Sequence, residues 1–191
     1  MNDATQTYLA LGDSMSIDDY TGVKGGGAVN QFHQSLGESW RLIDRTFDGA
    51  TMPRVYERIA EGSDLVTLTI GGNDLLVNQS RYLSEGLGHF GEEHSRLLTT
   101  IRGKNRSAVM IVGNVYAPQS GLSVEQERAL DEANRLIGEN VQKVQAQLAD
   151  IHGAFLGHEN KYLCLEIEPT LAGAKAIAAL FRDSFQMLRG G

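Results

Sequence analysis

The sequence of 191 residues contains a single cysteine, so it cannot form an internal disulfide. Cys164 lies in a mixed run with Leu163 and Leu165, where we expect a small buried hydrophobic side chain rather than a reactive thiol. Because 41% of the residues are hydrophobic, a chain of this length can bury a substantial core without disulfides. We therefore expect one globular domain over residues 1–191.

The sequence also lacks long apolar runs and clusters of basic residues. No stretch approaches the roughly 20 apolar residues that a membrane span needs, and residues 1–6 lack the basic and then apolar organisation of a signal peptide. We therefore expect a cytoplasmic protein without a membrane span. A net charge of -7 and the absence of a basic patch argue against a nucleic-acid partner. Nothing in the composition predicts an oligomeric state.

No motif for a metal or a nucleotide is present. His89, Glu92, Glu93 and His94 lack the spacing of a helical zinc motif, and we interpret them as a solvated helix face. The glycines between residues 22 and 27 lack the Gly-Lys-Ser/Thr ending of a phosphate-binding loop and do not follow a strand. The sequence therefore predicts a protein that needs no metal and no cofactor.

Short apolar runs indicate buried strands over residues 8–11, 65–70 and 108–112, and a weaker strand is indicated over residues 41–46. The three apolar runs do not alternate with polar residues, which favours strands covered on both faces, as in a parallel sheet.

Helical periodicity is clearest after Ser123, which forms a predicted capping box with Gln126. The expected apolar face of this helix comprises Leu130, Ala133, Ile137, Val141, Val144 and Leu148. A last helix is expected from about Thr170, with an apolar face of Ala174, Ile177, Phe181, Phe185 and Leu188. Alternating strands and helices predict a three-layer α/β/α sandwich around a central parallel sheet.

Two glycine-rich breaks directly follow predicted strands. The first is Gly12-Asp13-Ser14, and the second is Gly71-Gly72-Asn73-Asp74. Strand ends of one parallel sheet meet at the same edge, which is where ligands bind in such folds. Ser14 at such a position is a candidate nucleophile, although a serine after a glycine also commonly caps a helix.

A serine nucleophile needs hydrogen-bond donors for the oxyanion that develops during its attack. The amide side chain of Asn73 and the backbone N–H of Gly49, which follows the strand at residues 41–46, can supply them.

These segments, together with Ile167-Glu168-Pro169 near the C-terminus, resemble the four ordered blocks of the SGNH hydrolases, also called GDSL esterases and lipases. The resemblance spans nearly the whole chain and implies a flavodoxin-like sheet of about five strands. It also implies that Ser14 is the nucleophile and that the N–H of Ser14, the N–H of Gly49 and the side chain of Asn73 form the oxyanion hole. Asp13 and Asp74 have structural roles in that scheme.

The fourth block departs from the family pattern. That block reads Asp-x-x-His-Pro in the family, and alignment on Pro169 places Glu168 at the histidine and Leu165 at the aspartate. A glutamate with a reference pKa of about 4.3 is a weaker base than an imidazole near 6.5, although burial can raise its pKa. An apolar Leu165 is expected to help by desolvating Glu168.

Three interpretations follow from this departure. Glu168 is the general base for Ser14, or His158 or His152 replaces the missing histidine, or the site binds a ligand without turnover. The resemblance therefore implies a serine ester hydrolase for small carboxylic or carbohydrate esters that works through an acyl-enzyme. The alternative is a catalytically silent module that binds an acyl or sugar ligand.

Overall fold

The computed structural model describes residues 5–189 of the chain. Five parallel strands form the central sheet: β1 (Gln6–Gly12), β2 (Trp40–Asp44), β3 (Leu65–Thr69), β4 (Val109–Gly113) and β5 (Gln147–Ala149). The four strands predicted from the sequence are confirmed, with ends shifted by one or two residues. The apolar runs do not predict β5, because this three-residue strand at the edge of the sheet includes the polar Gln147.

The strand order β2-β1-β3-β4-β5 places β1 between β2 and β3. The chain therefore runs from β1 to the edge strand β2, crosses to β3 on the other side of β1, and continues through β4 to β5. In sheets of this order, ligands bind at the carboxyl ends of the two strands where the direction reverses. The segments that follow β1 and β3 carry Ser14 and Asn73.

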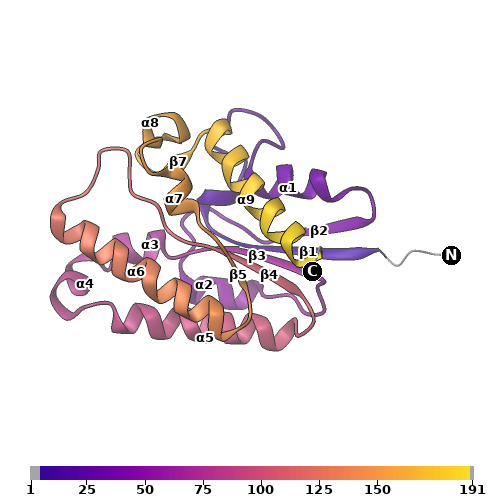
Figure 1. Ribbon diagram of the computed structural model, residues 1–191, viewed down its shortest axis with the longest axis horizontal. Coiled ribbons are helices and arrows are strands. Elements are labelled where there is room, and N and C mark those ends of the chain that lie inside the picture. Colours follow the sequence, from indigo (N-terminus) through magenta and orange to yellow (C-terminus); the bar gives the residue numbers. More distant parts are fainter. Residues whose placement is uncertain (1–4, 190–191) are drawn as a thin grey trace.

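Helices cover both faces of the sheet (Figure 1). On one side lie α1 (Ala28–Leu36), α7 (Ile151–Phe155), α8 (Glu159–Tyr162) and α9 (Leu171–Arg189). On the other side lie α2 (Met52–Val55), α3 (Gly72–Val77), α4 (Gln79–Glu85), α5 (Gly88–Lys104) and α6 (Val124–Lys143). Two 3₁₀ turns, η1 (Ser14–Ser16) and η2 (Tyr56–Arg58), complete these elements. This arrangement confirms the predicted α/β/α sandwich.

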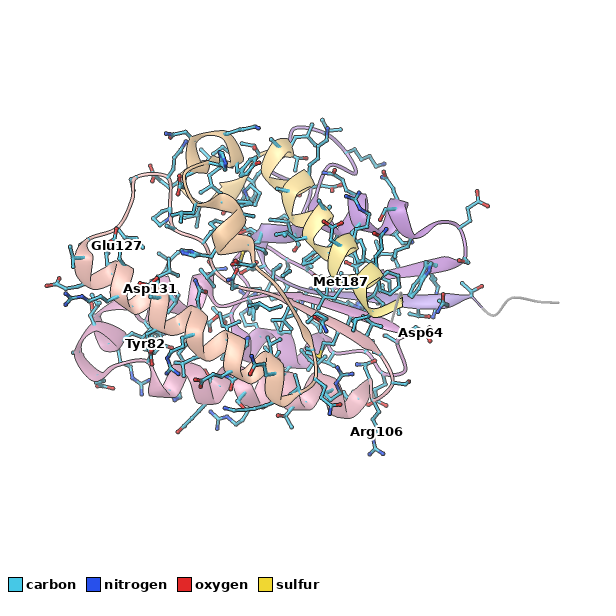
Figure 2. The ribbon with its side chains drawn as sticks, viewed as in Figure 1. Asp64, Tyr82, Arg106, Glu127, Asp131 and Met187 are labelled. Atoms are coloured by element: carbon cyan, nitrogen blue, oxygen red, sulfur yellow. The ribbon has the colours of Figure 1, made fainter. Side chains whose placement is uncertain are left out.

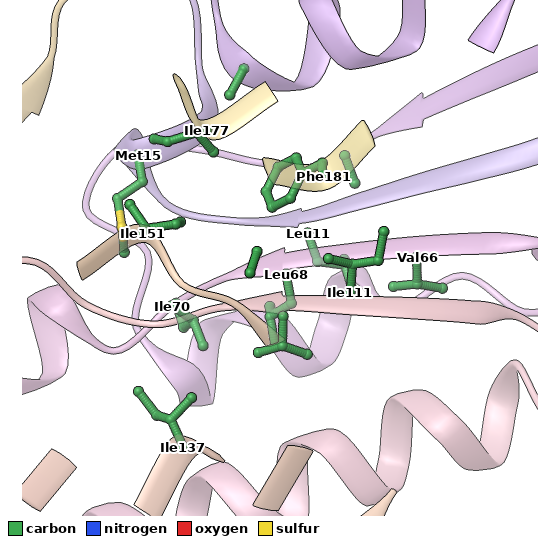
Figure 3. Close-up of a cluster of buried hydrophobic side chains, with 14 of the residues drawn as sticks. Leu11, Met15, Val66, Leu68, Ile70, Ile111, Ile137, Ile151, Ile177 and Phe181 are labelled. Atoms are coloured by element: carbon green, nitrogen blue, oxygen red, sulfur yellow. The ribbon is translucent and has the colours of Figure 1, made fainter. Parts of the chain in front are cut away.

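The core lies on both faces of the sheet (Figure 3). Residues of β1 and β3 such as Leu11, Val66 and Leu68 are buried, as expected for strands that are covered on both sides. Phe181 on α9 and Ile137 on α6 are buried against the two opposite faces of the sheet. Figure 2 shows charged side chains such as Arg106, Glu127 and Asp131 at the periphery of the molecule. Within residues 5–189, every helix is too short or too polar to cross a bilayer.

The two long helices begin where the sequence predicts. The capping box between Ser123 and Gln126 is formed, and α9 follows Thr170 directly. The predicted apolar faces of these two helices are wrong at their C-terminal ends. The helix α6 ends at Lys143, so Leu148 lies in β5 and is partly exposed, and Leu188 near the end of α9 is also exposed.

The interpretation of residues 89–94 as a solvated helix face is wrong for His94, which is completely buried, whereas His89 and Glu92 are exposed. Its Nδ1 faces the amide of Asn140 at 3.5 Å, and its Nε2 has no hydrogen-bond partner among the described residues. Burial lowers the pKa of His94 to about 4, so the ring is neutral at physiological pH. Among residues 5–189, no group of three or more His, Cys, Asp and Glu side chains is arranged to hold a metal.

A short antiparallel hairpin presents the fourth block of the sequence. It pairs β6 (Leu163–Cys164) with β7 (Glu168–Pro169), so that Cys164 is opposite Glu168. Strand β7 contacts η1, which carries Ser14. This contact brings the fourth block of the sequence next to the turn that follows the first strand.

The end of β1 depends on a close approach between Gly12 and Thr69. Gly12 has a φ of +131°, and a Cβ at this position would collide with the backbone and side chain of Thr69. The next residue, Asp13, donates its N–H to the carbonyl of Thr69 at 3.0 Å. The absence of a side chain at Gly12 therefore lets β1 and β3 stay paired up to the point where Ser14 begins.

We expect Gly12→Ala to lower the free energy of unfolding by about 3 kcal/mol or more, because backbone strain and overpacking against Thr69 add to one another. Gly62→Ala is the matched control, since Gly62 has a φ of +73° with open space around its Cα. This control should cost about 1 kcal/mol, from strain alone. Urea unfolding of both variants tests the difference, and equal costs would contradict it.

Candidate active site

Ser14 begins the 3₁₀ turn that directly follows β1, and only 7% of it is exposed. The side chain that caps this turn belongs to Asp13, which accepts a hydrogen bond from the N–H of Met15 at 3.2 Å. The hydroxyl of Ser16 is held by Thr69 at 2.8 Å. Capping is therefore performed by Asp13, and the hydroxyl of Ser14 is available for another role.

That hydroxyl lies beside the carboxyl group of Glu168, which is 8% exposed. Burial raises the pKa of Glu168, a hydrogen bond with the Ser14 side chain lowers it in part, and the negative charge of Asp48 raises it further. The net result is a pKa above the ordinary value for glutamate. The Oε2 atom of Glu168 is buried and has no hydrogen-bond partner among residues 5–189.

Other titratable groups surround Glu168. The charge of Glu168 raises the pKa values of Cys164, Tyr116 and Tyr20, and burial is the larger cause in each case. The Tyr20 hydroxyl donates to Asp48 at 3.2 Å, and the pKa of Tyr20 reaches about 12. The Cys164 thiol, which is half-buried, faces the carbonyl of Glu168 at 3.4 Å.

Leu165 does not have the role that we expected from the sequence. It is 74% exposed at the tip of the hairpin, with a φ of +47°, so it cannot desolvate Glu168. Glu168 itself is buried, and the strand that carries it, β7, contacts η1.

The segment with Gly49 lies next to the ends of β1 and β3. The N–H of Phe47 donates to the carbonyl of Gly12 at 3.1 Å, and the Asn73 side chain donates to the carbonyl of Ala50 at 3.0 Å. Gly49 has a φ of +64°, a backbone conformation that favours glycine. Ser14, Gly49 and Asn73 thus gather at one edge of the sheet, although they come from three different strand ends.

Asp74 has a structural environment. Its carboxylate accepts hydrogen bonds from the N–H of Met52 at 3.1 and 3.2 Å, which fixes the start of α2 to the start of α3. Burial raises the pKa of Asp74 to about 6 and that of Asp13 to about 8.

An apolar cavity of about 140 Å³ opens beside Ser14 and Asn73. Its apolar walls come mainly from α3, α6 and the β4–α6 loop (residues 114–123). They include Met15, Leu75, Val115, Leu122, Leu130 and Ile167. The cavity is therefore suited to a hydrocarbon group placed next to the Ser14 hydroxyl.

The two candidate histidines lie elsewhere. His152 is in α7, and His158 directly precedes α8. Neither histidine lines the cavity beside Ser14, and neither does Glu168, so the cavity lining does not distinguish these candidates. Among the described groups that shift the pKa of Glu168, none is a histidine.

Sequence reasoning did not identify four residues around this site: Tyr20, Asp48, Tyr116 and Glu166. The position of Asp48 beside Gly49 was a usable signal, and so was that of Tyr116, three residues after the end of β4. Tyr20 and Glu166 had no such signal, because only the folded loops bring them near the hairpin.

The architecture is that of known hydrolase structures. The lipase Lip_vut3 from a goat rumen metagenome is 23% identical, with a TM-score of 0.80 over 94% of this chain and 97% of that chain. Phospholipase A1 from Streptomyces albidoflavus NA297 is 20% identical, with a TM-score of 0.69 over 95% and 100% of the two chains. An acetylxylan esterase from Geobacillus stearothermophilus is 16% identical, with a TM-score of 0.71 over 95% and 94%. These identities show a shared fold.

The fold thus defines an α/β/α sandwich of the kind found in these hydrolase structures. The GDSL-like lipase/acylhydrolase family model matches residues 10–176. The chain therefore belongs to this family, as the motifs predict. No curated protein matches the sequence.

We expect Ser14→Ala to raise the pKa of Glu168, because the variant removes the hydroxyl that stabilises the charged carboxylate. Ser16→Ala is the matched control, since the hydroxyl of Ser16 is bonded to Thr69 and should leave the titration of Glu168 unchanged. The measurement is an NMR titration of the ¹³C-labelled carboxyl group. Equal titration curves for the wild type and Ser14→Ala would show that the two side chains do not interact.

Proposed function

We propose that the protein is a serine ester hydrolase in which Glu168 is the general base. The observation that carries this proposal is the pairing of the buried Ser14 hydroxyl with the buried carboxyl of Glu168 beside an apolar cavity. A raised pKa makes this carboxylate a better proton acceptor than an ordinary glutamate. No histidine is among the described groups that shift the pKa of Glu168, which supports Glu168 over a substitute histidine.

The reaction has two halves. Oγ of Ser14 attacks the ester carbonyl while Glu168 takes its proton, and a tetrahedral oxyanion forms. The N–H groups of Ser14 and Gly49 and the side chain of Asn73 stabilise that oxyanion. Glu168 returns the proton to the departing alcohol, which leaves an acyl group on Ser14. Water then attacks the acyl-enzyme with Glu168 again as base, and the carboxylic acid and the free serine are released.

The cavity supports a short acyl group as the preferred substrate. An apolar cavity of roughly 150 Å³ holds a molecule the size of benzene. The cavity beside Ser14 measures about 140 Å³ and is lined mainly by apolar side chains. We therefore propose an ester whose acyl chain has about six carbons or fewer, rather than an ester whose acyl part is a polar sugar acid.

We expect the wild type to hydrolyse 4-nitrophenyl butyrate, and Ser14→Ala to be inactive. Glu168→Gln should lower kcat/KM by about 10²- to 10⁴-fold, because it removes the general base. In the wild type, kcat/KM should rise with pH through the raised pKa of Glu168, since only the carboxylate accepts a proton. His158→Gln is the control and should keep full activity. Loss of activity in that control would instead make His158 the base, and absence of Ser14-dependent release at every pH would support the silent binding module.

We expect Asn73→Ala to lower kcat by about 10²- to 10³-fold with little change in KM, because its amide acts mainly on the transition state. Asn78→Ala is the matched control on the same segment. The side chain of Asn78 donates to the carbonyl of Asp74 at 2.9 Å and is not part of the cavity. Steady-state kinetics with 4-nitrophenyl butyrate tests both variants, and a fall in kcat of similar size in the control would contradict the assignment.

A further inference from the structure

The hairpin that carries Glu168 is too short to hold its own position. Each of its strands has only two residues, and isolated hairpins are at best marginally stable in water. Its turn is also strained, because Leu165 and Glu166 have φ values of +47° and +74°, which residues other than glycine rarely adopt. The surrounding structure must therefore fix the hairpin.

Three hydrogen bonds from the β4–α6 loop provide this fixation. The N–H of Gln119 donates to the carbonyl of Glu166 at 2.8 Å, and the N–H of Ser120 donates to Oε2 of Glu166 at 3.0 Å. The Tyr116 hydroxyl donates to the carbonyl of Ile167 at 2.6 Å. These contacts hold the two residues that directly precede Glu168.

The β4–α6 loop is itself anchored to its surroundings. The side chain of Asn134 on α6 makes hydrogen bonds of 2.9 and 2.8 Å with the N–H and the carbonyl of Val115. The side chain of Asn114 bonds to Asp150 and to the N–H of His152, each at 2.8 Å. The ring of Tyr116 is stacked on Phe155 with centroids 4.7 Å apart. The hydrogen bonds to the hairpin thus start from a well-supported segment.

We propose that Tyr116 and Glu166 are positioning residues that hold the carboxyl of Glu168 against the hydroxyl of Ser14. Both act at a distance from the reacting atoms, through the backbone of the hairpin. The catalytic consequence of this inference rests on the proposed function, whereas the placement of Glu168 can be measured without any substrate.

The first test compares Tyr116→Phe with Tyr162→Phe. Tyr116→Phe keeps the aromatic ring in the cavity wall and removes only the hydroxyl that bonds to Ile167. Tyr162 contacts the same Phe155 ring at 5.1 Å and is the matched control, because the bonds to the hairpin backbone do not involve its hydroxyl. We expect kcat for 4-nitrophenyl butyrate to fall roughly tenfold to a hundredfold in Tyr116→Phe, with KM nearly unchanged, and to stay at the wild-type value in the control.

The second test compares Glu166→Ala with Glu166→Gln. Glutamine keeps an oxygen that accepts the bond from Ser120 and removes the negative charge, whereas alanine removes both. We expect only the alanine variant to lose kcat. Because both variants lack the negative charge, a loss of kcat confined to the alanine variant cannot be an effect of that charge. Leu165→Gly serves as a further control, since it relieves strain at the exposed tip without removing a bond of the β4–α6 loop.

The readout that separates positioning from a general structural effect is the titration of Glu168 by carboxyl NMR in each folded variant. A released hairpin exposes Glu168 to water and also breaks its bond with Ser14; because burial is the larger of these two causes, the pKa should fall in Tyr116→Phe and Glu166→Ala, and the acid limb of kcat/KM should move to lower pH with it. An unchanged titration in these two variants would overturn the inference, whether or not kcat falls. If the wild type shows no Ser14-dependent hydrolysis, the proposed function fails, and the titration alone still decides the placement of Glu168.

Discussion

The packing of Gly12 against Thr69 is the constraint on which the site depends. Because Gly12 has no side chain, β1 stays paired with β3 to its last residue, and Asp13 continues the contact through its N–H. The position of Ser14 relative to the ends of β1 and β3 is therefore fixed. The segments with Gly49 and Asn73 are fixed relative to the same point, through the bonds of Phe47 to Gly12 and of Asn73 to Ala50.

Burial of carboxyl groups sets the electrostatics of this edge of the sheet. Asp13, Asp74 and Glu168 all have pKa values raised by burial. For each of them the folded state prefers the protonated form more than the unfolded state does. Their contribution to stability is therefore present below the unfolded pKa values and is lost as pH rises through the folded ones. Buried His94 acts in the opposite sense, because its lowered pKa makes folding less favourable as pH falls from about 6.5 toward about 4.

A glutamate in place of histidine changes what the site requires of its surroundings. An imidazole is oriented by a third residue that bonds its far nitrogen. At Glu168 the far oxygen is buried and has no partner within the described part of the chain, and the residue aligned with the family aspartate, Leu165, is exposed to solvent. Orientation of the carboxyl group must therefore come from the backbone that carries it. The bonds of Tyr116 and Glu166 to the hairpin fit that requirement.

The sequence by itself determined four of the five strands of the sheet and the identity of the candidate nucleophile. Continuous apolar runs require strands covered on both faces, and glycine followed by polar residues at the ends of β1 and β3 marks the edge where a ligand binds. Local periodicity also located the starts of α6 and α9. It failed for Leu148 and Leu188, because where a helix ends and which of its residues are covered depend on neighbouring elements.

Only the tertiary structure decided that Glu168, and not His158 or His152, lies beside the hydroxyl of Ser14. Glu168 is 154 positions away in the chain, and spacing alone does not distinguish it from a loop residue or a helix cap. The β6–β7 hairpin, its strained turn and the β4–α6 loop bring the two side chains together through three hydrogen bonds, in each of which at least one partner is a backbone group. Almost any sequence supplies such a backbone partner, and the side-chain partners Tyr116 and Glu166 bond to groups that are 51 and 46 positions away, so the residue pattern does not reveal these bonds.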